Sequence, residues 1–169
     1  MKSFVPLLCA LAIAGFAAPA RAQNVLTTHR LSAELASDAV KAAVAACAKQ
    51  GYKVTAAIVD ADGVEQAVLR GNGASMTALG AARDKAYTAF MLGAPRNEDS
   101  SGAIASRMGA NASAGGLAKL PHILLLQGAL VIRAGGEPIA AIGVGGAPGG
   151  NLDEGCAKAG VDAISERLK

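Results

Sequence analysis

The sequence predicts an α+β fold, in which helices cover an antiparallel sheet within a single domain. Short apolar runs separated by turn residues are typical of strands, and such runs occupy residues 53–70 and 120–144. Stretches with helical periodicity flank them, at residues 32–50, 74–92 and 151–168. The connections between successive strands are too short for parallel crossovers, so the strands are expected to pair antiparallel.

The first 22 residues have the pattern of a secretory signal peptide. Lys2 supplies the positive start, Phe4–Ala18 forms an apolar core, and residues 20–22 form a small-x-small cleavage site. The apolar run is too short for a mature membrane-spanning helix. We therefore expect one domain over residues 23–169 in a periplasmic or secreted protein, with an uncleaved anchor as the alternative.

Charge and aromatic content argue against a nucleic-acid partner. The chain has 16 basic and 13 acidic residues, and two of the basic residues, Lys2 and Arg21, leave with the signal peptide, so the mature balance is 14 to 13. A near-neutral chain without a basic run lacks the electrostatic footprint of nucleic-acid binding. Only three aromatic residues remain, too few for a platform on which bases could stack.

The first half of the mature chain predicts a short strand at 24–30, a helix at 32–50, and a hairpin. Ser32 can cap the helix and Gly51 can end it. Asp60–Gly63 is a turn between strands 53–59 and 64–70, since it lacks the other ligand positions of a calcium loop.

The second helix, at 74–92, has an alanine-rich packing face, and its periodicity places Lys85 on the opposite side. Residues 93–119 are irregular except for a short helix at 101–108, as in a lid, a binding loop or an oligomer contact.

The last third of the chain predicts the rest of the sheet. Three strands are expected, at 123–126, 129–132 and 138–144, followed by a closing helix at 151–168. Asp153 and Glu154 lie in the first turn of that helix, where the helix dipole favours acidic side chains.

Cys47 and Cys156 are the two cysteines of the mature chain, and both lie on predicted helices. We expect buried free thiols, because free cysteine packs as a small hydrophobic residue. The alternative is a disulfide between them, which an oxidising compartment would permit.

The glycine-rich loop Gly145–Gly150 is not a dinucleotide loop, since no strand and ribose-binding acid can follow it so near the C-terminus. We interpret it first as a turn with close backbone packing. It could also cradle an anion at a helix start, with Gly145 and Gly146 contributing backbone amides and Lys85 and Arg70 positive charge.

His122, which follows Pro121 at the start of an apolar run, is the leading candidate for a metal or haem ligand. Met108 is a weaker candidate for a second axial ligand, and His29 is a weaker histidine because it lies close to the terminus. No nucleophile constellation occurs in the sequence, so no catalytic residue is assigned.

Several local patterns resemble the GlcG/HbpS-like haem-binding family, which also includes the C-terminal domain of PduO-type proteins. The resemblance covers nearly all of the mature chain and is carried by a hairpin, a loop, a helix, a strand-turn-strand and a closing helix. The matching segments are Val59–Gly63, Arg70–Ala74, Lys85–Ala89, Gly135–Val144 and Asp153–Ala157.

The resemblance implies a profilin-like α+β fold, a homo-oligomer that is often ring-like or octameric, and haem as cofactor. Two segments depart from the family pattern. Gly128–Ile132 replaces a glycine-glycine-x-proline-isoleucine run, and Gly145 stands where a serine is usual, which removes one hydroxyl donor from the loop.

Three hypotheses therefore remain open: a secreted or periplasmic haem-binding protein that handles or senses haem, a binding protein or enzyme for small carboxylates, and a structural oligomeric module.

Overall fold

The sheet has four strands in the order β2-β1-β4-β3, and they pair antiparallel as the sequence predicts. The computed structural model describes residues 25–169, so the expected signal peptide lies outside the described residues. The strands are β1 (Thr55–Asp60), β2 (Glu65–Arg70), β3 (Ala129–Ala134) and β4 (Glu137–Gly145). Hairpins join β1 to β2 and β3 to β4, and the antiparallel pair β1-β4 joins the two hairpins at the centre.

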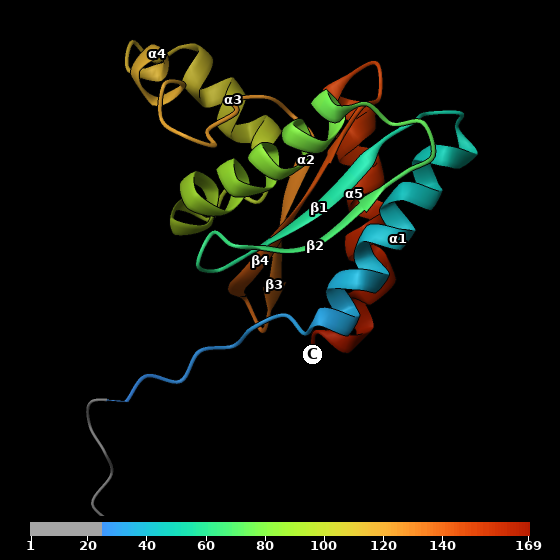
Figure 1. The fold of residues 1–169 in the computed structure, drawn as a ribbon. Helices are drawn as coiled ribbons and strands as arrows, with labels where there is room; N and C mark the ends of the chain where they lie inside the picture. Colours follow the sequence, from blue (N-terminus) through green and yellow to red (C-terminus); the bar gives the residue numbers. More distant parts are fainter. Residues whose placement is uncertain (1–24) are drawn as a thin grey trace, which may run out of the picture.

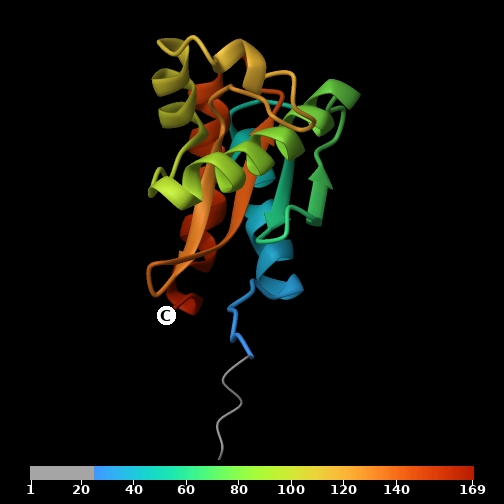
Figure 2. The ribbon, with the colours of Figure 1, turned by 90° about the vertical axis from the view of Figure 1, so that its left-hand side faces the viewer.

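Helices cover both faces of this sheet (Figures 1 and 2). Helices α1 (Ala33–Lys49) and α5 (Gly150–Ile164) pack side by side on one face, and α2 (Met76–Thr88) lies across the other. A π-helical turn η1 (Ala89–Gly93) and a 3₁₀ turn η2 (Ala94–Arg96) extend α2. They lead to α3 (Ser101–Gly109) and the short α4 (Ala114–Leu117), and a 3₁₀ turn η3 (Ser165–Arg167) follows α5.

Two hydrophobic clusters result from the alternation of side chains along the strands. Ile58 of β1 and Ile142 of β4 face α1 and α5 in the larger cluster. Val59 and Ala141, one position away on the same strands, face α2 and η1 in the smaller one. The α+β fold predicted from the sequence is confirmed.

Helix α2 approaches β4 so closely that only glycine fits beneath it. A Cβ atom on Gly143 would lie 2.1 Å from the carbonyl oxygen of Ala82, and one on Gly145 would lie 2.8 Å from that of Ala78. These two glycines therefore fix the position of α2 on the sheet, and with it every side chain that α2 presents.

The π-helical turn η1 marks the end of α2. The amide of Ala94 donates to the carbonyl of Ala89, five residues earlier, which is the π-helical pattern. Such turns are rare and are frequently found at functional sites. Here the turn decides the direction in which the residues after Gly93 leave the helix.

Cys47 and Cys156 form a disulfide, so the expectation of free thiols is wrong. Their Cα atoms are 5.6 Å apart, and 109 positions separate them in the sequence. The pairing follows from the contact between α1 and α5, because Cys47 lies on the buried face of α1 and Cys156 on the facing side of α5. The bridge is fully buried.

Two expected strands do not form among the described residues. Residues 25–30 are extended without pairing to the sheet, and the exposed side chains of Val25 and Leu26 explain why they lack a packing face. Residues 123–126 form part of a connecting loop that is bound to α2 instead. Within residues 25–169, no helix has the length and apolar character needed to cross a membrane.

Candidate functional site

His122 lies in the loop between α4 and β3, and α2 holds its backbone. The hydroxyl of Thr88, which is fully buried, accepts from the amide of Leu124 at 2.8 Å and donates to the carbonyl oxygen of Asp84 at 2.7 Å. The carbonyl oxygen of His122 lies 3.4 Å from the same hydroxyl. Between these anchors His122 adopts the left-handed region, with φ of +63°. This conformation is uncommon for a residue other than glycine, and it often marks a functional position.

The imidazole of His122 is oriented by two residues of α2. Its Nδ1 lies 3.1 Å from Oδ1 of Asp84, and its ring meets the edge of the Tyr87 ring with centroids 5.7 Å apart. A carboxylate can only accept, so Nδ1 carries the proton and donates to Asp84. In the neutral imidazole Nε2 therefore has the free lone pair. This is the tautomer and the carboxylate partner that histidine ligands of metals use.

Around His122 is a hollow of about 380 Å³ with mostly apolar walls. The Tyr87 ring, Met91 and Leu92 line it from the α2–η1 side, and residues 120–123 line it from the loop side. The side chain of His122 is 49% exposed, so the imidazole is open to solvent. The arrangement suits a flat apolar group that presents a metal to one nitrogen ligand.

Iron carried in such a group would need few protein ligands. In the described part of the chain, no group of three or more His, Cys, Asp or Glu side chains is arranged to hold a free metal ion. A macrocycle supplies four equatorial ligands itself, so a single imidazole is enough for axial coordination.

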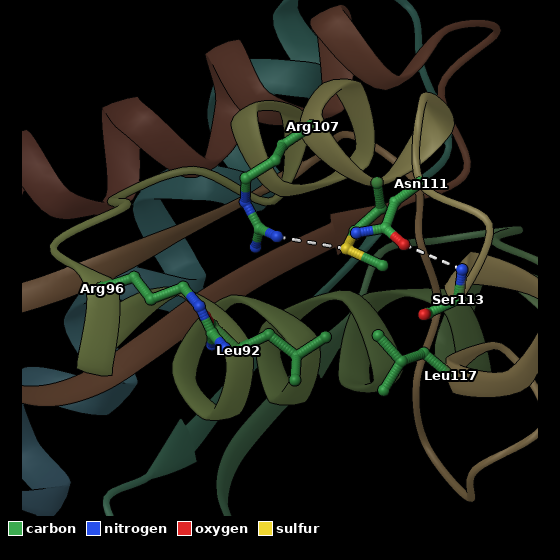
Figure 3. A pocket seen from close by; sticks show the side chains of 7 residues that line it. Leu92, Arg96, Arg107, Asn111, Ser113 and Leu117 are labelled. Atoms are coloured by element: carbon green, nitrogen blue, oxygen red, sulfur yellow. Dashed lines mark hydrogen bonds between the residues drawn. The ribbon is translucent and has the colours of Figure 1, made fainter.

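Met108 lies elsewhere. It is buried on α3, and its sulfur accepts a hydrogen bond from Nη1 of Arg107 at 3.2 Å. It lines a second hollow, shown in Figure 3, which shares Leu92 with the His122 hollow. The structure therefore does not bring Met108 and His122 together, and Met91 is the methionine in the His122 hollow.

His29 is also remote from the His122 hollow. Its Nδ1 lies 2.6 Å from Oε2 of Glu137, at the turn between β3 and β4, and its side chain is 69% exposed. It lines a different hollow, together with the C-terminal residues.

Lys85 is buried, so the expectation that it points away from the packing face is wrong. Its ammonium donates to Oδ2 of Asp153 at 2.7 Å and to the carbonyl oxygen of Val144 at 3.2 Å. Asp153, also buried, uses its other oxygen to accept from the amide of Ala147 at 3.0 Å. The charge pair explains the burial, since each buried ion has an opposite charge and a further hydrogen bond.

The glycine-rich loop lies next to this pair in a hollow of about 390 Å³. Gly145 packs under α2, and Gly146, with φ of +118°, packs against the backbone of Lys53. Arg70 is exposed at the end of β2 and makes no ion pair among the described residues. Asp153 thus binds two of the groups near this hollow, the Lys85 ammonium and the Ala147 amide.

Sequence reasoning missed the residues of α2 that orient His122. Asp84 and Thr88 are one helical turn apart, which places them on the same side of α2. That spacing was visible in the sequence. Their contact with a loop 34 to 38 positions later was not, because nothing in that loop signals which helix it binds.

Comparison with known proteins identifies the family. The family model described as "Haem degrading protein HbpS-like" matches residues 31–162, which is most of the chain. The chain belongs to the HbpS-like family. The resemblance noted from the sequence is thereby confirmed.

Solved structures agree with this assignment of an HbpS-like fold. A double mutant of Streptomyces reticuli HbpS is 35% identical, with a TM-score of 0.76, covering 94% of this chain and 99% of that one. The Klebsiella pneumoniae protein ORFY is 20% identical, with a TM-score of 0.75, covering 84% and 95% of the two chains. The complex of PduOC with haem is 22% identical, with a TM-score of 0.70, covering 80% and 96%. No curated protein matches the sequence of this HbpS-like chain.

Proposed function

We propose that this HbpS-like protein binds haem, with Nε2 of His122 as an axial ligand of the iron, and that it handles or senses haem outside the cytoplasm. The observation that carries the proposal is the hydrogen bond between His122 and Asp84 inside an apolar hollow. It leaves Nε2 as the nitrogen with a free lone pair on a histidine that lines the hollow.

The residues present fit the group. The walls of the hollow are apolar, which suits a porphyrin ring, and the nitrogen donor suits iron. Bound haem would supply redox and ligand-binding chemistry at its iron. Three residues of α2 would position the ligand. Thr88 would bind the loop that carries His122, and Asp84 would keep the proton on Nδ1 of His122. Tyr87 would set the tilt of the imidazole ring.

The relatives support the same ligand. The family is described by haem degradation, and the PduOC neighbour was solved as a haem complex. A likeness at 22% identity carries the fold alone, so the ligand argument depends on the His122 hollow.

Export is part of the proposal, because it would explain both the signal-peptide pattern of residues 1–22 and the disulfide between Cys47 and Cys156. The pattern of residues 1–22 is that of a cleaved secretory signal. The Cys47–Cys156 disulfide supports it, since structural disulfides persist mainly in oxidising compartments. N-terminal sequencing of the exported protein should find Gln23 as the first residue; an intact Met1 on the exported protein would contradict cleavage.

A homo-oligomer is also proposed. Strand β2 is an edge strand, and Val68 on it and Val64 directly before it are exposed, at 36% and 60%. Such edges invite pairing with another chain. Light scattering on the mature protein should give a mass of several chains, and a monomer mass at micromolar concentration would contradict this part of the proposal.

Hemin titration tests the function directly. The mature protein should give a saturable shift of the Soret band at micromolar hemin, and His122→Ala should remove or displace that band. His29→Ala is the matched control, since His29 is an exposed histidine with a carboxylate partner on another part of the surface. Absence of saturable binding would overturn the proposal, and an unchanged spectrum of His122→Ala would overturn the ligand assignment.

A carboxylate-binding protein is the alternative function. The geometry favours it less, because Lys85 and the loop amide of Ala147 are both bound to Asp153. Thermal-shift measurements with small hydroxy acids and keto acids should therefore show no rise in melting temperature, and a saturable rise with one acid would favour the alternative.

A further inference from the structure

A second hollow lies beside the His122 hollow, and Leu92 lines both. It has a volume of about 170 Å³ and combines apolar walls with two guanidinium groups (Figure 3). Arg96 reaches it from η2, and Arg107 reaches it from α3. The hollow is therefore positively charged on one side and continuous with apolar surface on the other.

Arg107 is largely occupied by a carboxylate. Its Nε and Nη2 donate to the two oxygens of Glu98 at 2.6 and 2.9 Å, and its Nη1 donates to Met108. This fork fixes Arg107 at the wall of the hollow. It also neutralises one of the two positive charges.

Arg96 keeps most of its donors free. It is exposed, and its Nη1 donates to the carbonyl oxygen of Leu92 at 3.1 Å. No carboxylate lies within ion-pair distance of Arg96 in the part of the chain that the structure describes. The hollow therefore has a net positive charge, and the guanidinium that carries it has donors to spare for an anion.

The bond to Leu92 places this charge at the border between the two hollows. Arg96 is held on the carbonyl of a residue whose side chain also lines the His122 hollow. A ligand that filled the His122 hollow and extended past Leu92 would therefore bring its edge to the Arg96 guanidinium.

We propose that Arg96 binds a propionate carboxylate of the haem whose iron His122 holds, with the porphyrin edge lying over Leu92. This inference rests on the proposed function. A guanidinium presents a planar fork that matches a carboxylate, which gives the contact both strength and direction. Arg107, whose charge is neutralised by Glu98, forms the wall of the hollow beside Arg96.

The test combines a side-chain change with a ligand change. Arg96→Gln keeps an amide donor for the Leu92 carbonyl and removes the charge, and Arg30→Gln is the matched control, because Arg30 pairs with Asp62 near the β1–β2 turn. Hemin and hemin dimethyl ester, in which both propionates are neutral, are titrated into each variant. Circular dichroism confirms that each variant is folded.

We expect Arg96→Gln to weaken hemin binding about ten-fold or more, as for loss of a hydrogen bond between charged groups. The Soret maximum should not move, because the iron ligand is unchanged. Esterification should weaken binding to the wild type and should abolish the difference between wild type and Arg96→Gln. Arg30→Gln should match the wild type for both ligands.

Equal hemin affinities of wild type and Arg96→Gln would overturn the inference, as would an equal loss for hemin and its ester. Both results leave haem binding itself intact, whereas absence of saturable binding to the wild type refutes the proposed function. If Arg96→Gln does not fold, Arg96→Lys and the wild-type ester comparison decide the question: equal affinity of the wild type for hemin and ester overturns the inference.

Discussion

The ammonium of Lys85 and the carboxylate of Asp153 are 2.7 Å apart, and both side chains are almost completely buried. This contact joins α2 to the first turn of α5, across the end of the sheet where β4 enters the glycine-rich loop. It therefore holds the two faces of the molecule together at the end of β4. It also occupies the Lys85 ammonium and, through the other oxygen of Asp153, the amide of Ala147 in the glycine-rich loop.

Removing one partner of this pair should be costly. Lys85→Met is expected to lower the free energy of unfolding by about 3–5 kcal/mol, because it leaves the Asp153 carboxylate buried without its counter-charge. Urea denaturation measures the loss. The double variant Lys85→Met with Asp153→Asn keeps an acceptor for the Ala147 amide and should recover part of it.

Lys41→Met is the matched control for Lys85→Met, since Lys41 is exposed and its ion pair with Asp38 is long, at 4.0 Å. It should change stability by less than about 0.5 kcal/mol. If Lys85→Met lowered the free energy of unfolding by as little, the buried pair would contribute little to the stability of the fold.

The disulfide should stabilise the fold strongly. It closes a loop of 109 positions, for which the chain-entropy model gives about 4–5 kcal/mol. Reductant should therefore lower the melting temperature of the wild type but leave that of the double variant Cys47→Ala with Cys156→Ala unchanged. Thiol titration of the unfolded, unreduced mature protein should find no free thiol, and two free thiols would contradict the bridge.

Asp84 should matter for haem affinity without touching haem. Asp84→Asn removes the carboxylate that accepts from His122 Nδ1, and loss of such a partner typically costs 10–100-fold in metal affinity. Hemin titration measures it, and the Soret band of the complex should shift as the basicity of the imidazole falls. Asp84 also pairs with Arg83, its Oδ1 lying 3.0 Å from Nε of that arginine, so the control is Asp62→Asn, which likewise removes a carboxylate paired with an arginine and should have no effect. Wild-type affinity and spectrum in Asp84→Asn would exclude this positioning role.

Glu98 should make stability depend on pH. The fork from Arg107 lowers the pKa of Glu98 from its ordinary value of 4.5, with burial opposing it. Because the pKa of Glu98 is lower in the folded state, its ion pair stabilises the fold fully at pH values above the ordinary pKa. This stabilisation disappears as the pH falls through the folded-state pKa. Glu98→Gln should thus be about 1 kcal/mol less stable than wild type at pH 7, and this gap should close below about pH 4.5.

Chemical denaturation at about five pH values between 3 and 8 measures the difference in free energy of unfolding between Glu98→Gln and the wild type. Glu166→Gln, at a residue 83% exposed, is the control and should show almost no gap at any pH. A gap for Glu98→Gln that persisted undiminished at the acidic end would contradict the assignment to this ion pair.

Gly143 should tolerate no side chain. Gly143→Ala would place a methyl group 2.1 Å from the Ala82 carbonyl, so α2 would have to move, at a cost of about 2 kcal/mol or more. Gly155→Ala is the matched control, because its helical site is open and alanine favours a helix by about 0.5–1 kcal/mol. Melting temperatures should move in opposite directions, and a neutral Gly143→Ala would show that the packing of α2 can adjust.

The fold was predictable because its signals are local. Ser32 caps α1 as expected, and the Asp60–Gly63 turn separates β1 from β2. The helix expected at 101–108 is α3. Periodicity, caps and turn residues act within a few positions of one another, so a single sequence carries them completely.

The candidate site was less predictable because its contacts are distant. His122 was singled out, but Asp84 was not, and Lys85 was placed on the wrong side of its helix. Helical periodicity assigns a lysine to the solvent face by default, and only the approach of Asp153 from 68 positions away makes its burial favourable. The same holds for the disulfide, whose cysteines meet only once α1 and α5 pack.

The π-helical turn of residues 89–93 has an evolutionary consequence. Deleting a single codon there would restore an ordinary α-helix and rotate the residues that follow directly, as far as Arg96, by about 100°. Arg96 would then leave the edge of the hollow, while His122, Asp84 and the sheet would stay in place. One short deletion or insertion could thus separate propionate recognition from iron ligation, and lineages could lose or acquire it without rebuilding the fold.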